Sequence, residues 1–185
     1  MTKKQLRAQI RSRLSGLSDE YKRKSSAEIE RLLLLSDEYK NARSIFIYTS
    51  TPNEPCTDGI IGNALCSGKT VYVPRCLERG VMVPVRIDRD TQYEEGYMGI
   101  KEPVEYDKDL SLSQVDLSII PCMSAAPDGR RLGHGAGFYD IFLSKTKTFR
   151  LCLCFNELVS YEIPTDEYDV KMDCVITENG IFYVK

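Results

Sequence analysis

The segment at residues 128–145, DGRRLGHGAGFYDIFLSK, constrains the fold more than any other part of the chain. It follows the continuous apolar run at 116–121, typical of a buried strand, and it ends in a helix expected from about 137 to 145. Between the two lies a loop with glycines at positions 129, 133, 135 and 137. In open α/β sheets, ligands bind beyond the carboxyl ends of the strands. The segment therefore predicts an α/β fold with a binding site at this loop.

The chemistry of the loop is typical of an anion-binding site. Glycine has no Cβ, so its backbone N–H groups can approach a ligand closely, and the N-terminus of the following helix carries unpaired N–H groups. Arg130 and Arg131 add two guanidinium groups, and Asp140, one turn into the helix, is placed to hold a metal ion. The pattern GxGxG matches neither the P-loop nor the Rossmann fingerprint, so a plain tight turn is the alternative. The two arginines and the position after a strand favour a polyphosphate ligand.

The rest of the chain alternates between helical and strand patterns. Helices are expected at 2–15, at 18–35 with Ser18 as N-cap, and at 58–67; strands are expected at 44–50, 70–74, 81–87 and 149–155. Residues 93–105 read as a polar excursion, and an Asn179-Gly180 turn predicts a C-terminal hairpin. The βαβ spacing favours parallel strands. We predict one three-layer, Rossmann-like α/β domain over residues 1–185, with a mainly parallel central sheet.

Charge, hydropathy and cysteine content argue against several classes of function. The net charge of −2 indicates no basic face for nucleic acid, and no apolar run approaches the roughly 20 residues of a membrane span. The N-terminal segment lacks the apolar stretch of a secretory signal. The seven cysteines form no CxxC pair and the single histidine cannot complete a usual zinc set, so we expect reduced, buried thiols in a cytoplasmic protein. We expect a monomer, because nothing indicates an extensive apolar interface.

Two further groups of charged residues are candidates for the same site. Lys3, Arg7 and Arg11 recur every four residues on the first expected helix. Such a row most often faces solvent, but it would reach phosphate oxygens if the helix folded over the sheet edge. Glu54 lies in a proline-flanked loop after the first strand, either as an ordinary loop carboxylate or as an acceptor for the N–H groups of a heterocycle.

The remaining candidates are two aspartates and the histidine. Asp169 and Asp173 are either surface charges, or one of them meets Asp140 around a divalent cation, which prefers hard oxygen ligands. His134 has no Ser or Cys nucleophile marked out beside it, so the sequence does not support a catalytic triad. Inside the glycine loop, this histidine is expected to contact a ligand or to be exposed.

Five short segments, in order along the chain, carry a resemblance to one known family. They are KKQLR at 3–7, EPCT at 54–57, GIKEP at 99–103, RLGHGAGFYDIFL at 131–143 and YDVKMD at 168–173. They resemble the KxxLR, ExxT, GIxEP, RLGxGxGYYDxxL and hDxxxD elements of the 5-formyltetrahydrofolate cyclo-ligases, also called methenyltetrahydrofolate synthetases. One such motif would be weak, but five in the right order are specific.

The resemblance implies an enzyme that uses ATP and Mg²⁺ to close 5-formyltetrahydrofolate to 5,10-methenyltetrahydrofolate, with release of ADP and phosphate. The N5-formyl group is amide-like and a poor electrophile, so transfer of the γ-phosphoryl group to its oxygen would activate it for attack by N10. Such transfer depends mainly on positioning and charge neutralisation, so the chemistry needs basic residues and Mg²⁺ more than a protein nucleophile.

The resemblance also implies which residues form the site, none of them a catalytic nucleophile. Contacts with ATP are implied for Lys3, Lys4, Arg7, Arg131, Leu132, Gly133, His134, Gly135, Ala136, Gly137, Phe138 and Tyr139. Contacts with the folate substrate are implied for Thr49, Glu54, His134, Gly135, Ala136, Gly137 and Phe138. The implied ligands of Mg²⁺ are Asp140 and Asp173.

Three positions depart from the family pattern, and two other functions are weighed against the enzyme. Phe138 replaces the first Tyr of YYD, Tyr168 stands where many members have His, and Ala136 leaves only its backbone for a phosphate. The main alternative is a non-catalytic module that binds folate or nucleotide on the same fold. A different enzyme of this architecture, such as a sugar-phosphate isomerase or an acyl-CoA transferase, ranks lower because Glu54 would be its only candidate base or nucleophile.

Overall fold

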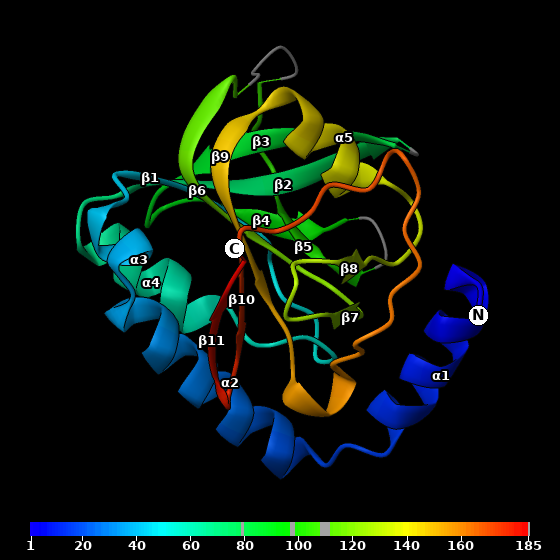
Figure 1. Ribbon diagram of the computed structural model, residues 1–185. Coiled ribbons are helices and arrows are strands. Elements are labelled where there is room, and N and C mark those ends of the chain that lie inside the picture. The colour runs from blue at the N-terminus through cyan, green and yellow to red at the C-terminus, as the bar shows by residue number, and fades with distance from the viewer. Residues whose placement is uncertain (79, 97–98, 108–111, 185) are drawn as a thin grey trace.

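The computed structural model describes the whole chain except residues 79, 97–98, 108–111 and 185. A seven-stranded sheet forms its centre, in the order β11-β10-β9-β6-β1-β2-β3 (Figure 1). Its strands are β1 (Ser44–Ile47), β2 (Thr70–Glu78), β3 (Val81–Ile87), β6 (Gln114–Ile120), β9 (Lys147–Leu153), β10 (Cys174–Thr177) and β11 (Gly180–Tyr183). Pairing is parallel from β10 through to β2, and antiparallel pairs lie at both ends, β10 with β11 and β2 with β3. The predicted mainly parallel sheet and C-terminal hairpin are confirmed.

The connections between strands determine where a ligand can bind. From β1 the chain passes through α4 (Asp58–Cys66) to β2, and from β6 it passes through α5 (Phe138–Lys145) to β9, in the opposite direction along the sheet. Right-handed crossovers that run in opposite directions place their helices on opposite faces. The adjacent strands β1 and β6, in which Ile45 pairs with Leu117, therefore send their following chains apart. Open α/β sheets bind ligands at such a divergence.

Helices cover both faces of the sheet. In Figure 1, α2 (Asp19–Leu35) and α3 (Asp37–Asn41) lie with α4 on one side of the sheet, and α5 lies on the other. On the α5 side, Phe142 stacks on Phe46 of β1 with ring centroids 4.2 Å apart. Such an aromatic pair contributes about 0.5–1.5 kcal/mol beyond its buried area. The prediction of an N-cap at Ser18 is confirmed, because its hydroxyl accepts the Tyr21 N–H at 3.1 Å.

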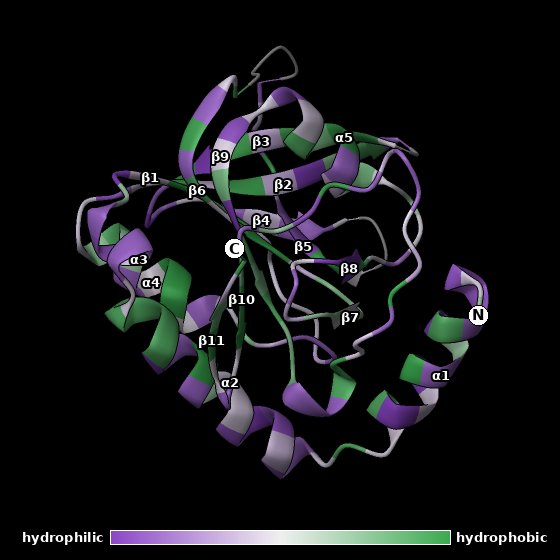
Figure 2. Ribbon diagram, in the orientation of Figure 1, coloured by the Kyte–Doolittle hydropathy of each residue, from purple (hydrophilic) through white to green (hydrophobic). Residues whose placement is uncertain are grey.

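The first helix, α1 (Lys3–Ser15), lies against the 3-10 helix Asn156–Leu158, apart from the other helices (Figure 1). It begins at a capping box in which Thr2 and Gln5 exchange hydrogen bonds. Hydrophobic and hydrophilic residues alternate along it (Figure 2), and its side chains Leu6 and Ile10 are buried against the rest of the protein. The helix predicted at 2–15 is therefore confirmed.

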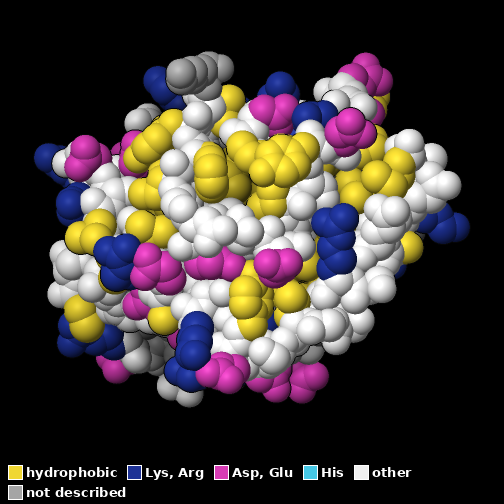
Figure 3. Space-filling view, turned by 60° about the horizontal axis from the view of Figure 1, so that its bottom comes forward, with side chains coloured by type: hydrophobic (Ala, Val, Ile, Leu, Met, Phe, Trp, Pro, Cys, Tyr) yellow, Lys and Arg dark blue, Asp and Glu magenta, His cyan; other side chains and the backbone are white. Residues whose placement is uncertain are grey.

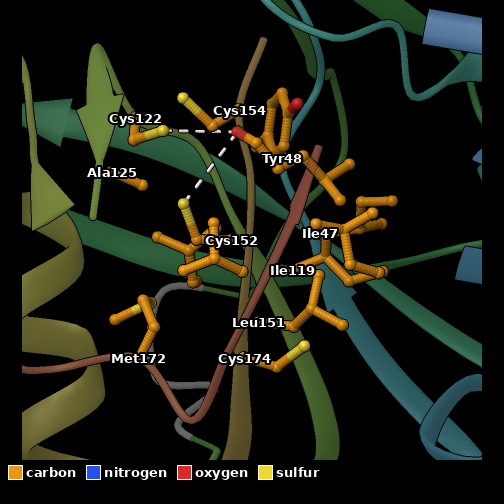
Figure 4. Packing of buried hydrophobic residues seen from close by; sticks show 14 of the residues in the cluster. Ile47, Tyr48, Ile119, Cys122, Ala125, Leu151, Cys152, Cys154, Met172 and Cys174 are labelled. Atoms are coloured by element: carbon orange, nitrogen blue, oxygen red, sulfur yellow. Dashed lines mark hydrogen bonds between the residues drawn. The ribbon is translucent and has the colours of Figure 1, made fainter. Parts of the chain in front are cut away.

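Cysteines fill part of the core between β6 and β10. Cys152 and Cys154 lie at alternate positions along β9 and its continuation, and the Cys122 thiol donates to the Leu153 carbonyl oxygen at 3.3 Å (Figure 4). There Cys behaves as a small apolar residue. The buried free thiols are those of Cys122, Cys152, Cys154 and Cys174, whereas Cys56 and Cys66 are exposed. The prediction of buried thiols is therefore wrong for Cys56 and Cys66, and Cys76 is only half-buried.

The polar excursion predicted at 93–105 contains a short hairpin, β4 (Tyr93–Glu95) and β5 (Lys101–Pro103). Its strands lack the apolar alternation by which strands are recognised, and hydrogen bonds with β2 hold it instead. Arg75 pairs with Glu94 at 2.6 Å, and the Cys76 N–H donates to the Glu102 carboxylate at 3.1 Å. Residues 97–98 of this predicted excursion lie outside the described residues. A second hairpin that the sequence did not predict, β7 (Ser124–Ala125) with β8 (Arg131–Leu132), has only two residues in each strand.

The surface mixes charges of both signs. On the face in Figure 3, Lys and Arg side chains are interspersed with Asp and Glu side chains. Within the described ranges, no helix has the length and apolar character needed to cross a membrane.

Candidate active site

A cleft with a volume of about 1830 Å³ lies at the divergence of β1 and β6. Its walls come from α1, the loop between β1 and α4, the glycine loop, the start of α5 and the segment 166–170. Residues of α2 and of the β4–β5 hairpin also line it. The predicted site residues that line it are Lys3, Arg7, Thr49, Glu54, Arg131, Leu132, Gly133, His134, Gly135, Ala136, Gly137, Phe138, Tyr139 and Asp140. The structure thus gathers segments that are distant in the sequence around one cavity.

The glycine loop leaves backbone groups free at the cleft. Gly135 (φ +109°) and Gly137 (φ +77°) have positive φ angles, which glycine adopts without strain. Gly137 is the residue before α5 and offers no side-chain cap to the N-terminus of that helix. A Cβ at Gly135 would lie 3.3 Å from Cζ of Arg7. The loop therefore brings backbone N–H groups and a guanidinium together, as an anion site requires.

The basic row of α1 lines the cleft and does not lie on a purely solvated face. The Nε–H of Arg7 donates to the Gly133 carbonyl oxygen at 2.8 Å, which ties α1 to the glycine loop. The Lys3 ammonium pairs with Asp166 at 2.7 Å and with Asp169 at 2.5 Å. Burial alone would lower the pKa of Lys3, but its hydrogen bonds with these carboxylates outweigh burial and raise it. Lys3 is therefore protonated, and its ion pairs position its ammonium group in the cleft wall.

Asp140 is held by two donors. Its Oδ1 accepts a hydrogen bond from the Arg131 guanidinium at 2.8 Å and one from the Val170 N–H at 3.2 Å. Arg131 also donates to the Pro121 carbonyl oxygen at 3.1 Å. Asp140 and Asp169 both line the cleft, and Val170 directly follows Asp169 in the chain, so the two carboxylates belong to neighbouring parts of the wall.

Glu54 is the carboxylate of the loop after β1, and it is nearly enclosed. Its side chain is 9% exposed, and its Oε2 accepts hydrogen bonds from the N–H and the hydroxyl of Thr51, both at 2.9 Å. Its Oε1 lies 3.4 Å from Nε2 of His134, which is 53% exposed. The hydroxyl of Thr49, also in the cleft wall, is buried and has no hydrogen-bond partner among the described residues. Oε1 and this hydroxyl are the groups left for a polar substrate.

Two tyrosines enclose this end of the cleft. Tyr48 is buried, and its hydroxyl donates to the Pro55 carbonyl oxygen at 2.8 Å. Burial, and then the charge of Glu54, raise the pKa of Tyr48 and of Tyr139. Both phenols therefore stay neutral and cannot act as bases at ordinary pH.

Three residues weighed for the site do not line the cleft. Asp173 pairs with the Arg150 guanidinium, at 2.9 Å and 2.5 Å from its two carboxylate oxygens, and also accepts the Arg150 N–H. Arg130 turns to Asp128 and to the Tyr161 carbonyl oxygen. Lys4 is exposed and does not line the cleft. Asp173 therefore lies outside the cleft wall to which Asp140 and Asp169 belong.

The carboxylates of the cleft suit a cation that is coordinated partly by the protein and partly by phosphate oxygens of a substrate. Among the residues that the structure describes, no group of three or more His, Cys, Asp or Glu side chains is arranged to hold a metal. Mg²⁺ commonly takes one or two carboxylates and completes its shell with water and substrate phosphates. Asp140 and Asp169 match that requirement.

Sequence reasoning did not foresee the contributions of α2 and of Asp166. The α2 residues in the cleft wall are Lys22, Arg23, Ser26, Ala27 and Glu30. On a helix these side chains read as part of an ordinary solvated face, and no signal in the sequence indicates that the cleft extends to them. Asp166 lies three residues before Asp169 in a segment without helix or strand, so its meeting with Lys3 could not be read from periodicity.

Comparisons with known proteins agree over nearly the whole chain. Residues 1–178 match the model of a family described as the 5-formyltetrahydrofolate cyclo-ligase family. The 5-formyltetrahydrofolate cyclo-ligase of Mus musculus is 30% identical over 191 residues, covering 96% of this chain and 94% of the mouse protein. A probable 5-formyltetrahydrofolate cyclo-ligase of Schizosaccharomyces pombe is 29% identical, covering 98% and 97%.

The fold has close counterparts among solved structures. The 5,10-methenyltetrahydrofolate synthetase of Aquifex aeolicus superposes with a TM-score of 0.87 at 25% identity, covering all of this chain and 94% of that one. The corresponding synthetase of Mycoplasma pneumoniae, at 20% identity, shares the fold with a TM-score of 0.74.

Proposed function

The chain belongs to the 5-formyltetrahydrofolate cyclo-ligase family, and from this premise we propose how its cleft closes 5-formyltetrahydrofolate to 5,10-methenyltetrahydrofolate with ATP. The observation that carries the proposal is one cavity that combines an anion site with an enclosed carboxylate. Lys3, Arg7 and the loop at 133–137 form the anion site, and Glu54 is the carboxylate. A reaction between a triphosphate and a polar heterocycle needs both in one place.

The chemical steps follow from the two substrates. The formyl oxygen attacks the γ-phosphorus of ATP, the bond to the ADP oxygen breaks, and an N5-iminium phosphate forms. The N10 nitrogen then attacks the formyl carbon and loses its proton, and phosphate leaves as the five-membered ring closes. Neither step needs a covalent bond to the protein. Orientation of the two reactants and neutralisation of the phosphate charge supply the catalysis.

The phosphate end of the cleft is assigned to α1 and to the glycine loop. The N–H groups at 133–137 would bind phosphate oxygens together with Arg7, and the N-terminus of α5 would add its partial positive charge. Lys3 would exchange Asp166 and Asp169 for the phosphate. When bound, Mg²⁺ neutralises charge on the phosphates, and we assign its protein ligands to Asp140 and Asp169, in place of the pair Asp140 and Asp173.

The folate end of the cleft is assigned to the loop after β1. Glu54 Oε1 would accept N–H groups of the pterin, because its Oε2 is already used by Thr51. The Thr49 hydroxyl would pair with a polar edge of the same ring. Phe138 offers an apolar face to the flat ring, while His134 stands beside Glu54 at the opening.

The test is a near-ultraviolet absorbance trace of the purified protein with 5-formyltetrahydrofolate, to which ATP and then Mg²⁺ are added. We expect the methenyl chromophore to rise only when both are present. Lys3→Ala should lower kcat/KM for ATP by about 10- to 100-fold, the value of a hydrogen bond to a charged group, whereas Lys4→Ala is the matched control outside the cleft. Folate binding with a flat trace would indicate a non-catalytic module and contradict the proposal.

A further inference from the structure

We propose that Arg131 is a positioning residue for the metal site, which holds Asp140 through its Oδ1 and leaves Oδ2 to the cation. The inference rests on the proposed role of Asp140 as a metal ligand, and it replaces the expectation that Arg131 contacts ATP.

The Arg131 guanidinium is buried and already engaged on both terminal nitrogens. Its side chain is 3% exposed, compared with 24% for Lys3, which lies in the same cleft. One terminal nitrogen donates to the Pro121 carbonyl oxygen, beyond the end of β6, and the other donates to Asp140. Arg131 thus connects the sheet to α5 by a rigid, planar group that Lys cannot imitate.

The hydrogen bonds of Asp140 are asymmetric. Within the described residues, the donors from Arg131 and from the Val170 N–H both go to Oδ1. Two donors on one oxygen fix the plane of the carboxylate and leave the other oxygen for a ligand. Partners that orient a metal-binding carboxylate commonly affect metal affinity by about 10- to 100-fold when they are replaced.

The rival assignment is a direct contact between Arg131 and phosphate. It would use Nε, whose N–H is buried and has no partner among the described residues. The two assignments differ in one measurable respect. A phosphate contact stabilises bound nucleotide with or without metal, whereas a positioning residue acts only through the cation.

The experiment compares Arg131→Lys with Arg130→Lys. Arg130 precedes Arg131 in the chain, but it pairs with Asp128 outside the cleft, so the same substitution there is a matched control. ADP affinity is measured by calorimetry in EDTA and again across a series of Mn²⁺ concentrations. We expect Arg131→Lys to leave metal-free ADP affinity within twofold of the original and to raise the Mn²⁺ concentration for half-maximal effect by about 10- to 100-fold. The Arg130→Lys protein should change neither.

Other outcomes overturn the proposal in distinguishable ways. A loss of ADP affinity in EDTA that persists at every Mn²⁺ concentration would identify Arg131 as a phosphate contact. If ADP affinity does not depend on Mn²⁺ in either the original protein or Asp140→Asn, the metal site on which the inference rests is absent. If Arg131→Lys does not fold, NMR of the unaltered protein distinguishes the two assignments through the Nε–H resonance of Arg131. It should respond to Mg²⁺ with ADP, and a shift on ADP alone would refute positioning.

Discussion

Replacing Thr49 by Val should stabilise the substrate-free protein and weaken its affinity for folate. The Thr49 hydroxyl is buried without a partner among the described residues, and Val has the same shape with a methyl group instead. A buried unsatisfied polar group costs about 1–3 kcal/mol. We expect the lower end, about 1 kcal/mol, because Thr49 is only half-buried as a residue and borders an open cleft. For a chain of this size that is a rise in Tm of roughly 2–4 °C.

The same substitution at Thr57 should have the opposite sign. The Thr57 hydroxyl donates to the Tyr48 carbonyl oxygen at 2.8 Å and accepts the Ser50 N–H at 3.2 Å, and the residue is fully buried. Thr57→Val would leave both backbone groups without that partner, so we expect a loss of about 1–3 kcal/mol. The two variants make the same chemical change, at a hydroxyl without a partner in one case and at a hydrogen-bonded hydroxyl in the other.

The measurements are thermal melting followed by circular dichroism and KM for 5-formyltetrahydrofolate in the absorbance assay. Thr49→Val should melt higher and show a raised KM with nearly unchanged kcat, since in the proposed arrangement the hydroxyl contacts the substrate and takes no part in the chemical steps. A Tm at or below that of the original protein would refute the reasoning, because it would mean that the hydroxyl is already hydrogen-bonded in the free protein.

Three further predictions concern charge and backbone. Asp140→Asn should lower turnover far more than Tm, because the amide oxygen still accepts from its neighbours while the charge for the cation is lost; comparable losses in both would contradict this. Gly129→Ala should prevent stable folding at ordinary temperature, since a Cβ there lies 2.4 Å from the Met172 carbonyl oxygen at φ +86°, and a normal melting curve would count against it. Burial raises the pKa of Asp173, but its bonds with Arg150 lower it more, so the pKa is below its ordinary value. This pair therefore stabilises the fold above the unfolded-state pKa, and the stabilisation is lost as pH falls through the folded value; urea unfolding of Asp173→Asn should show a flatter acid limb.

Local patterns predicted the framework well because each rests on one segment. The helix behind Ser18, the strand at 81–87 and the hairpin at Asn179-Gly180 each carry their own signal, an N-cap, an alternation or a turn dipeptide. The glycine loop predicted the binding edge for the same reason. The hairpin β4–β5 was missed because its stability comes from Arg75 of another strand.

The site was harder to predict because its members meet only in the folded chain. Asp169 and Asp173 lie four residues apart in one short segment, and their partners in the fold distinguish them: Lys3 for one and Arg150 for the other. The motif resemblance supplied Lys3 and Glu54, which composition and periodicity alone would have left as surface charges. Neither approach indicated that α2 borders the cleft, because the sequence of a polar helix face is the same whether that face borders solvent or a cleft.

The ion pairs of Lys3 have a consequence for how nucleotide arrives. The wall of the cleft carries acidic side chains as well as basic ones, and Lys3 is already neutralised by Asp166 and Asp169 before any ligand enters. In the proposed function, entry of a triphosphate would be an exchange of counter-ions within the cleft, because acidic side chains offset the basic ones in its wall. Association should accordingly depend weakly on ionic strength, and the selection of phosphate happens at contact, when Lys3 changes partners, and not during the diffusive approach.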